Sequence, residues 1–260
     1  MKKFGLCGNP VVHSLSPKLF AVAYPQDRYS YELFQTSDPR EAIHLFLKKG
    51  LVGMNVTSPL KISILPFVHR QMPECAIIGA CNLVLKQDDF LVACNTDYLG
   101  VSNSLIQAHV SMKNTICLLL GAGGAAKAAA YALLQEGALL LWANRTLAHI
   151  PHSFNSFSIR SIPLHQAAHY LPICNIIVNT LPLPFADTNI FKFHAQQIVF
   201  DASYATRPLE KQAIHAGSQY ISGEQWLLYQ AIPSFTAMTG IPPPTHLLEE
   251  AIKRYLPLSK

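Results

Sequence analysis

The sequence predicts an α/β protein with two domains. Three observations lead to this prediction: short apolar runs alternate with helical segments, a glycine-rich turn follows one such run near the middle of the chain, and two apolar helical segments end it. Alternating strands and helices favour parallel sheets covered by helices. At 260 residues the chain can form one large domain or two modest ones.

The first elements alternate strand, helix, strand, helix and strand, an order typical of a parallel sheet. Asp38 and Pro39 suit the start of the second helix, and Gly50 suits its end. The strands are expected at Phe4–Gly8, Tyr29–Phe34 and Leu51–Val56, and the second helix at Asp38–Lys49.

Two serines lie at the start of the first helix. Ser16 precedes Pro17, which suits a serine N-cap with proline at the first helical position. Ser14 is not needed for that cap. Because a helix N-terminus attracts anions, the two hydroxyls are also candidates for holding a carboxylate.

Lys61 follows the third strand closely. Ser58 and Pro59 suit a second cap and first helical position, which puts Lys61 in the first turn of a helix. A cation there opposes the helix dipole at a cost of about 0.3–1 kcal/mol. We therefore expect something other than local stability to require this charge.

A β-hairpin is expected at Ala80–Leu85 and Phe90–Cys94, followed by a helix at Tyr98–His109. Asp97 stands where the helix begins. The residues alone leave two interpretations of Asp97 open: a helix cap or first-turn acid, and a functional carboxylate.

A strand, a glycine turn and a helix follow one another in the middle of the chain. The turn, Gly121-Ala122-Gly123-Gly124-Ala125-Ala126, fits the pattern G-x-G-x-x-A between an apolar strand at Thr115–Leu120 and an alanine-rich helix at Ala125–Leu134. The first glycine permits the tight turn, the second lets the backbone approach a pyrophosphate, and the small third residue lets helix and strand pack closely. This context favours a Rossmann-type dinucleotide site over a turn that binds nothing.

The next strand, Leu139–Ala143, ends at Asn144-Arg145-Thr146. An NAD site would place Asp or Glu there to accept hydrogen bonds from the ribose. A carboxylate would repel a 2′-phosphate, whereas Arg145 would attract one. NADP is therefore favoured over NAD.

The rest of the chain gives weaker signals. Strands are expected at Asn175–Asn179 and Ile198–Asp201, and helices at Glu224–Phe235 and Thr245–Tyr255. We expect the last helices to fold back over the first domain. The predicted domains are residues 1–100 with 224–260, and residues 101–223, with the active-site cleft between them.

Composition narrows the function. Only 13% of residues are charged and 50% are hydrophobic, which predicts a globular chain. The net charge of +5 is scattered, so small anionic ligands are favoured and a nucleic-acid partner is not expected.

No apolar run approaches the roughly 18 residues needed to span a bilayer, and no secretory core precedes Gly8, so a cytoplasmic protein without a membrane partner is expected. The six cysteines include no C-x-x-C pair, which predicts reduced core residues and no metal site. The oligomeric state, monomer or homodimer, stays open.

Several short motifs together resemble the shikimate dehydrogenase family, over nearly the whole chain. They are Gly8-Asn9-Pro10 with His13-Ser14-Leu15-Ser16-Pro17, Gly53-Met54-Asn55-Val56-Thr57 with Pro59 and Lys61, Gly79-Ala80-Cys81-Asn82, Asn95-Thr96-Asp97 with Gly100, Gly121 to Ala126, Asn144-Arg145-Thr146, and Gly223 with Leu227 and Gln230.

The resemblance implies reversible reduction of 3-dehydroshikimate to shikimate by NADPH, in the biosynthesis of chorismate and the aromatic amino acids. It implies that Lys61 and Asp97 form the catalytic pair and that Ser14 and Ser16 hold the substrate carboxylate. It also implies a substrate site completed by Thr57, Asn82, Tyr204 and Gln230, and a cofactor site formed by Gly121, Ala122, Gly123, Gly124, Ala125, Asn144, Arg145, Thr146 and Gly223.

The chain departs from the family pattern at Phe20-Ala21, at Leu181–Pro184, at Trp226 and in a shorter loop after Tyr204. Two alternatives remain: a quinate or quinate/shikimate dehydrogenase that uses NAD, and a non-catalytic regulator that binds the same ligands. Arg145 argues against the first, and the presence of both Lys61 and Asp97 argues against the second.

Overall fold

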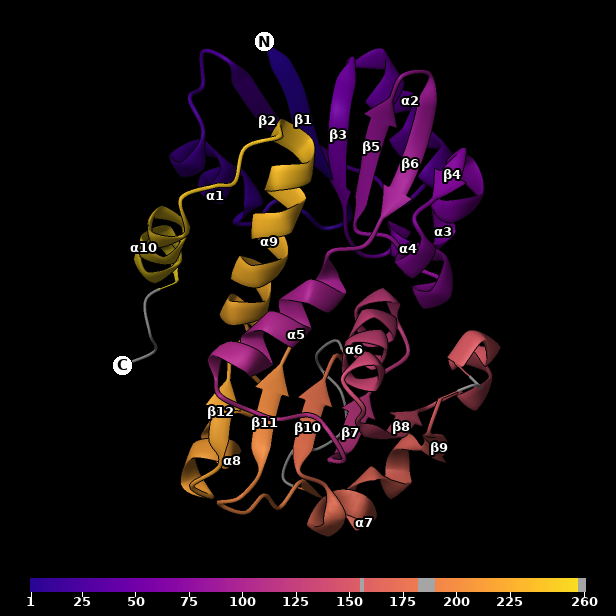
Figure 1. Ribbon diagram of the computed structural model, residues 1–260, viewed down its shortest axis with the longest axis vertical. Coiled ribbons are helices and arrows are strands. Elements are labelled where there is room, and N and C mark those ends of the chain that lie inside the picture. Colours follow the sequence, from indigo (N-terminus) through magenta and orange to yellow (C-terminus); the bar gives the residue numbers. More distant parts are fainter. Residues whose placement is uncertain (155–156, 182–189, 257–260) are drawn as a thin grey trace. The chain divides into compact units, whose positions relative to one another are not determined.

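The computed structural model describes residues 1–154, 157–181 and 190–256 (Figure 1). The chain divides into two compact units: the first unit holds residues 1–96 and 230–260, and the second unit holds residues 97–229. Each unit is built around a six-stranded sheet. The α/β class that the sequence predicts is confirmed. The limits expected from the sequence, at residues 100 and 223, lie a few residues from these.

The sheet of the first unit combines a parallel part and a hairpin. Its strand order is β2-β1-β3-β5-β6-β4, with β1, β2 and β3 parallel and β5 antiparallel to both β3 and β6. Consequently β6 runs in the same direction as β1 and β3. The strands are β1 (Lys2–Gly8), β2 (Tyr29–Gln35), β3 (Leu51–Val56), β4 (Arg70–Gln71), β5 (Leu83–Gln87) and β6 (Phe90–Cys94).

Helices cover both faces of this sheet. On one face α2 buries Ala42 and Phe46 against Cys7, Phe34 and Met54. As predicted, Asp38 caps α2, and its side chain accepts a hydrogen bond from the Arg40 N–H at 2.9 Å. The first four helices are α1 (Ser16–Ala23), α2 (Pro39–Lys48), α3 (Leu60–Ser63) and α4 (Pro73–Ile78).

The second unit holds a fully parallel sheet. Its order is β12-β11-β10-β7-β8-β9, so that the first strand of the unit lies at the centre, the next two extend to one side and the last three to the other. This is the Rossmann strand order. The strands are β7 (Ile116–Leu120), β8 (Leu139–Asn144), β9 (Ile159–Pro163), β10 (Ile176–Asn179), β11 (Ile198–Asp201) and β12 (Gln219–Ile221).

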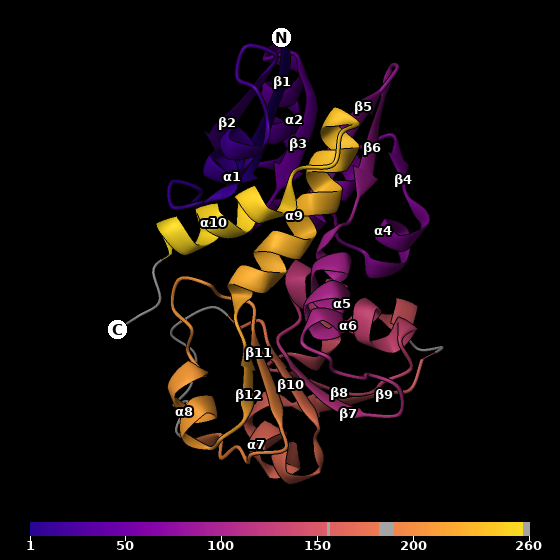
Figure 2. The same cartoon turned by 60° about the vertical axis from the view of Figure 1, so that its left-hand side comes forward.

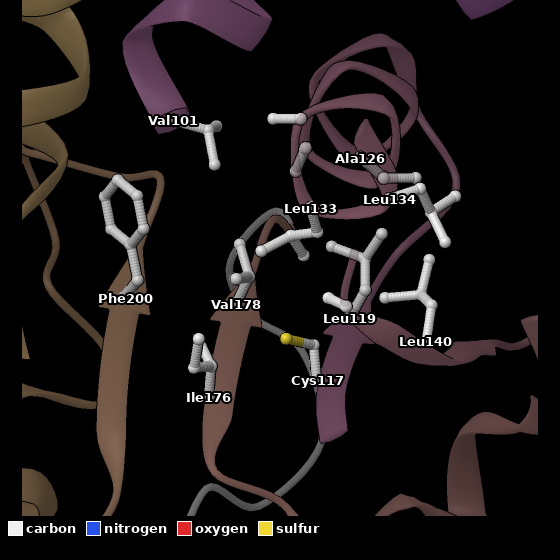
Figure 3. Close-up of a cluster of buried hydrophobic side chains, with 14 of the residues drawn as sticks. Val101, Cys117, Leu119, Ala126, Leu133, Leu134, Leu140, Ile176, Val178 and Phe200 are labelled. Atoms are coloured by element: carbon white, nitrogen blue, oxygen red, sulfur yellow. The ribbon is translucent and has the colours of Figure 1, made fainter. Parts of the chain in front are cut away.

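The core of the second unit shows why the central helix is rich in alanine. Helix α6 presents alanines, among them Ala126, to the sheet, and small side chains let a helix lie close to strands. Figure 3 shows Leu119, Val178 and Phe200 on the strands facing this helix and Val101 above them. The helices of this unit are α5 (Asp97–Gln107), α6 (Gly124–Gln135), α7 (Ala167–Tyr170) and α8 (Glu210–His215).

Two helices end the chain, as the sequence predicts. The limit between the units falls within α9 (Gly223–Thr239), between Tyr229 and Gln230, and α10 (Thr245–Tyr255) returns beside α1 (Figure 2). The later part of α9 packs its Phe235 against Phe20 of α1, with ring centroids 5.1 Å apart. Phe20 thus belongs to an aromatic core, which accounts for its apolar character.

Among the described residues, no helix combines the length and apolarity that crossing a bilayer requires. Within the same part of the chain, no cluster of His, Cys, Asp and Glu could hold a metal ion. The six cysteines are free thiols, and burial raises the pKa of Cys75 to about 12 and that of Cys94 to about 11.

Candidate functional site

Within the first unit, the predicted substrate residues gather at one edge of the sheet. Strands β1, β3 and β6 run in the same direction, so the segments that follow them leave from one edge, and β5 begins there. Ser14 and Ser16 follow β1, Thr57 and Lys61 follow β3, and Asn82 directly precedes β5. Gln230 on α9 joins this set through its contact with Asn82.

Gly8 lets two of these segments meet. A Cβ at Gly8 would lie 2.4 Å from Thr57 Cγ2 and 2.7 Å from the Ser58 carbonyl oxygen, so only glycine fits there. The Asn9 N–H donates to the same Ser58 oxygen at 2.9 Å. The turn after β1 and the turn after β3 are therefore held against each other.

The serines act locally in a way the sequence does not predict. Helix α1 begins at Ser16, its N-cap is Leu15, and no side chain caps it, so the expected Ser16 N-cap is wrong. Instead Ser14 Oγ accepts from the Ser16 N–H at 3.2 Å and donates to Ser16 Oγ at 3.3 Å. The reason is that Ser16 already lies inside the helix, where its hydroxyl cannot reach back to the first amides.

A buried polar chain continues from Ser16. Ser16 donates to the hydroxyl of Tyr31, which donates to Asn55 Oδ1 at 2.8 Å. The Asn55 amide donates to the Asn82 carbonyl at 3.1 Å and to Ser234 Oγ at 2.7 Å. Burial raises the pKa of Tyr31 well above its usual value, so the phenol stays protonated.

The sequence does not identify Tyr31 as part of this site. Asn55 does indicate a buried polar contact, because an amide inside the apolar run of β3 must find hydrogen-bond partners there. Nothing in the sequence shows that the partner is on β2.

Asn82 fixes the loop that precedes Asp97. Its Oδ1 accepts from the Thr96 N–H at 2.7 Å, and its Nδ2 donates to Thr96 Oγ1 at 2.8 Å and to Gln230 Oε1 at 3.2 Å. Asn95 donates to the Ala80 carbonyl at 2.8 Å. Asp97 follows Thr96 directly and is the first residue of α5, where only 5% of its surface is exposed.

Lys61 is attached to the same group of segments. Its carbonyl accepts from the Cys81 N–H at 2.7 Å, and Cys81 precedes Asn82. The predicted cap is wrong: α3 begins at Leu60 after Pro59, no side chain caps it, and it has four residues. Lys61 therefore lies in its first and last turn at once, and the expected opposition to a helix dipole disappears.

In the second unit, the predicted cofactor residues lie at the carboxyl edge of the sheet. The glycine turn follows β7, Asn144–Thr146 closes β8, and β7 and β8 are neighbours. Gly121 has a φ of 108°, and a Cβ there would lie 2.5 Å from Thr180 Oγ1. Gly121 is therefore required both by its backbone conformation and by its close approach to Thr180.

The glycine turn leaves open space at Gly123, where a ligand would approach the protein backbone. A Cβ at Gly123 would meet nothing within 4 Å, and Gly123 is the N-cap of α6 with no side-chain cap. No side chain therefore caps the first amides of the twelve-residue helix α6, and these amides lie beside open space. Ala126, the third small residue, is fully buried, as close helix packing predicts.

A tryptophan holds the turn from the neighbouring strand. Trp142 on β8 is fully buried, and its Nε1–H donates to the Gly121 carbonyl at 2.6 Å. The Gly121 N–H donates to the Ala143 carbonyl at 2.9 Å. The sequence shows Trp142 as one more apolar strand residue, because this bond depends on the register between β7 and β8.

Beyond β8, Asn144 is buried and turns the chain by donating from Nδ2 to the Thr146 carbonyl at 2.8 Å. Arg145 and Thr146 are exposed. A guanidinium held on a short turn beside the glycine loop can reach an anionic group. The geometry of this turn and of the glycine loop fits a dinucleotide phosphate.

Tyr204 and Gly223 also lie at this edge, after β11 and β12. A Cβ at Gly223 would lie 2.4 Å from the Ala202 carbonyl oxygen and 2.7 Å from the Tyr204 nitrogen, so the segment carrying Tyr204 rests on the start of α9. Of the departures from the family pattern, residues 182–184 lie outside the described residues.

The second unit has the strand order of the Rossmann class of dinucleotide-binding α/β proteins, and the first unit gathers polar side chains at one edge of its sheet. A family model for the shikimate dehydrogenase substrate binding domain matches residues 6–84. The shikimate dehydrogenase (NADP(+)) of Methanothrix thermoacetophila is 31% identical over 266 residues, which cover 98% of both chains. The chain belongs to the shikimate dehydrogenase family.

Solved structures agree with this assignment. Shikimate dehydrogenase from Aquifex aeolicus superposes with a TM-score of 0.88 at 29% identity, covering 97% of this chain and 98% of that one. Shikimate 5-dehydrogenase from Thermus thermophilus, in complex with NADP(H) and shikimate, superposes with a TM-score of 0.81 at 30% identity, covering 98% and 100% of the two chains.

Proposed function

We propose that this chain is an NADP-dependent shikimate dehydrogenase, which catalyses the reversible reduction of 3-dehydroshikimate to shikimate in the biosynthesis of chorismate and the aromatic amino acids. The observation that carries this proposal is the convergence of Ser14, Ser16, Thr57, Lys61, Asn82 and Gln230 at one edge of the first sheet. The family motifs that supply these residues are scattered through the sequence, yet hydrogen bonds tie their segments together.

The substrate carboxylate is assigned to Ser14 and Ser16: Ser14 would donate to it, and the Ser16 N–H holds the Ser14 oxygen at 3.2 Å. Ser14 is only partly buried, and its hydroxyl proton is engaged in a long bond of 3.3 Å to Ser16. Turning that proton towards a carboxylate costs little and gains a charge-assisted bond. Thr57 and Gln230 offer a hydroxyl and an amide group for the ring hydroxyls, and Asn82, whose amide hydrogens are engaged with Thr96 and Gln230, orients Gln230. Tyr204 is also assigned to the substrate.

Cofactor binding is assigned to the glycine turn and to the turn after β8. The amides at the start of α6 would bind the pyrophosphate, and Gly123 leaves room for its approach. Arg145 would pair with the 2′-phosphate that distinguishes NADP from NAD, while Asn144 and Thr146 shape the turn beneath it. Gly223 completes the set. Bound NADPH would supply the hydride.

Lys61 and Asp97 are assigned the proton chemistry. As hydride reaches the ketone carbon, negative charge develops on its oxygen, and the Lys61 ammonium donates a proton to that oxygen. The carboxylate of Asp97 would direct the ammonium and compensate its charge. In the reverse direction Lys61 accepts the proton from the hydroxyl. We further propose that the enzyme acts in the cytoplasm, as a monomer or homodimer, without a nucleic-acid or membrane partner.

The test is a steady-state assay of the purified protein that follows nicotinamide absorbance, with shikimate or quinate crossed against NADP or NAD. We expect turnover with shikimate and NADP, and a kcat/KM lower by about tenfold or more with NAD, since a phosphate pairing contributes about 1.5–3 kcal/mol. Preference for NAD or for quinate would favour the alternative dehydrogenase. Binding of shikimate without turnover would favour a non-catalytic regulator.

A further inference from the structure

The segment that carries Tyr204 forms a closed loop, residues 202–208, which we call the tyrosine loop. Its base is fixed by the buried carboxylate of Asp201, whose Oδ2 accepts from the Leu209 N–H and from the Tyr220 hydroxyl, both at 3.0 Å. The Asn179 amide donates to Asp201 Oδ1 at 2.8 Å. The two ends of the loop are therefore joined by hydrogen bonds that do not involve its middle.

The start of the loop rests against a glycine. A Cβ added at Gly223 would lie 2.4 Å from the Ala202 carbonyl oxygen and 2.7 Å from the Tyr204 nitrogen, which leaves no room for a side chain. The backbone of the loop and the backbone of α9 are thus in direct contact next to Tyr204.

The middle of the loop is strained. Arg207 has a φ of 40°, a conformation that residues other than glycine rarely adopt. Strain of this kind persists only where surrounding structure holds it, and such positions gather at functional sites.

The Arg207 side chain supplies the holding contacts. Its guanidinium pairs with Glu224, the second residue of α9, and with Glu210 Oε1 at 3.4 Å. The Arg207 side chain is 9% exposed and that of Glu224 is 14% exposed, so solvent screens the pair weakly. Ser222 Oγ donates to the second oxygen of Glu224 at 3.3 Å, which fixes the direction of the carboxylate.

We propose that Arg207 is a positioning residue for the reaction: its ion pair with Glu224 holds the tyrosine loop in a strained conformation on which the contribution of Tyr204 to shikimate binding depends. The inference rests on the proposed function, in which Tyr204 contributes to the substrate site. Because Asp201 closes the base of the loop independently, the ion pair is not needed to hold β11, the start of α8 and β12 together. Its effect falls on the loop between them.

The experiment uses steady-state kinetics of the full chain with Arg207→Gln, Glu224→Gln and the double variant. Each single variant should raise the KM for shikimate by about fivefold or more while the KM for NADP stays within about twofold. The double variant should lose no more than the worse single variant, because both remove one interaction. When Tyr204 is already alanine, Arg207→Gln should add little. Lys211→Gln, which removes an exposed cation from the same helix as Glu210, is the matched control and should keep the wild-type KM.

Two further variants keep the test decisive if Arg207→Gln folds poorly. Arg207→Gly removes the pair but also removes the backbone strain, so it should fold well and still raise the KM for shikimate. Arg207→Lys keeps the charge and should recover part of the loss. Hydrogen exchange of the ligand-free protein should be faster at residues 203–206 in Arg207→Gly.

A folded Arg207→Gln or Arg207→Gly protein with a wild-type KM for shikimate would overturn the proposal. So would an equal rise of both Michaelis constants, which would indicate a general loss of structure. Absence of turnover in the wild type is a different result, because it refutes the proposed function itself.

Discussion

Replacing Trp142 by phenylalanine tests how the glycine turn is held. The change removes the Nε1–H that donates to the Gly121 carbonyl at 2.6 Å and leaves an aromatic ring in its place. The second anchor of the turn, from the Gly121 N–H to the Ala143 carbonyl, is untouched. The perturbation is thus confined to one side of the turn.

The expected magnitude follows from the burial of Trp142, which is complete. A buried carbonyl left without its donor costs about 1–3 kcal/mol, and the missing ring atoms add about 1 kcal/mol. The midpoint of thermal unfolding should therefore fall by about 4–16 °C, since each kcal/mol corresponds to about 2–4 °C in a chain of this size. If the substitution makes the binding-competent conformation of the turn about 1 kcal/mol less stable in the ligand-free protein, the Kd for NADP rises about fivefold.

Calorimetric titration with NADP, and separately with shikimate, at a temperature where the variants are folded, separates these effects. The Kd for NADP should rise and that for shikimate should stay constant. Phe154→Leu is the matched control, because it removes the ring packed 5.4 Å from Trp142 and leaves the hydrogen bond in place. It should lower stability without changing the Kd for NADP. An unchanged Kd for NADP in Trp142→Phe, or an equal rise in the control, would refute the reasoning.

Three other predictions concern the proposed roles directly. Arg145→Ala should raise the KM for NADP about tenfold or more and leave the use of NAD nearly unchanged; a wild-type KM would place the 2′-phosphate elsewhere. Lys61→Met should lower kcat about 100-fold or more, with a smaller change in the KM for shikimate. The double variant with Asp97→Asn should lose far less kcat than the product of the two single losses. A wild-type kcat in Lys61→Met would contradict the proton-transfer role. Ser14→Ala should weaken shikimate binding about tenfold with little loss of stability, while Ser16→Ala should chiefly lower stability; chemical denaturation and titration of both variants decide between them.

The elements of the fold could be predicted from sequence because they depend on local signals. The strand at Leu51–Val56, the strand at Ile198–Asp201 and the helix at Thr245–Tyr255 have the predicted limits, since apolar runs and turn residues mark both ends. The helix expected at Glu224–Phe235 continues to Thr239 past Pro233. The reason is packing: the last turns of α9 bury Phe235 and Met238, and this burial outweighs the backbone bond that proline removes.

The helix starts near the site could not be predicted, because the same residues suit two geometries. A serine before a proline is a frequent cap, and both Ser16 and Ser58 fit that pattern. At Ser16 the helix begins one residue early, and at Ser58 it begins after the proline. Which of these occurs depends on the approach of the turns after β1 and β3, a contact between distant parts of the sequence.

The direction of the hydrogen bonds explains why the two serines are expected to differ. The Asn55 Nδ2 donates to the Asn82 carbonyl and to Ser234 Oγ, so Oδ1 is the end of the amide that faces Tyr31. An amide oxygen can only accept, so Tyr31 must donate to it. A phenol has one hydrogen, so the Tyr31 oxygen is left to accept from Ser16. The Ser16 proton is therefore committed to a buried partner, whereas the Ser14 proton makes only a long bond to Ser16 Oγ. A carboxylate that approaches this edge gains a bond from Ser14 without leaving a buried acceptor unpaired, and taking the Ser16 proton would break a chain that extends to Asn55.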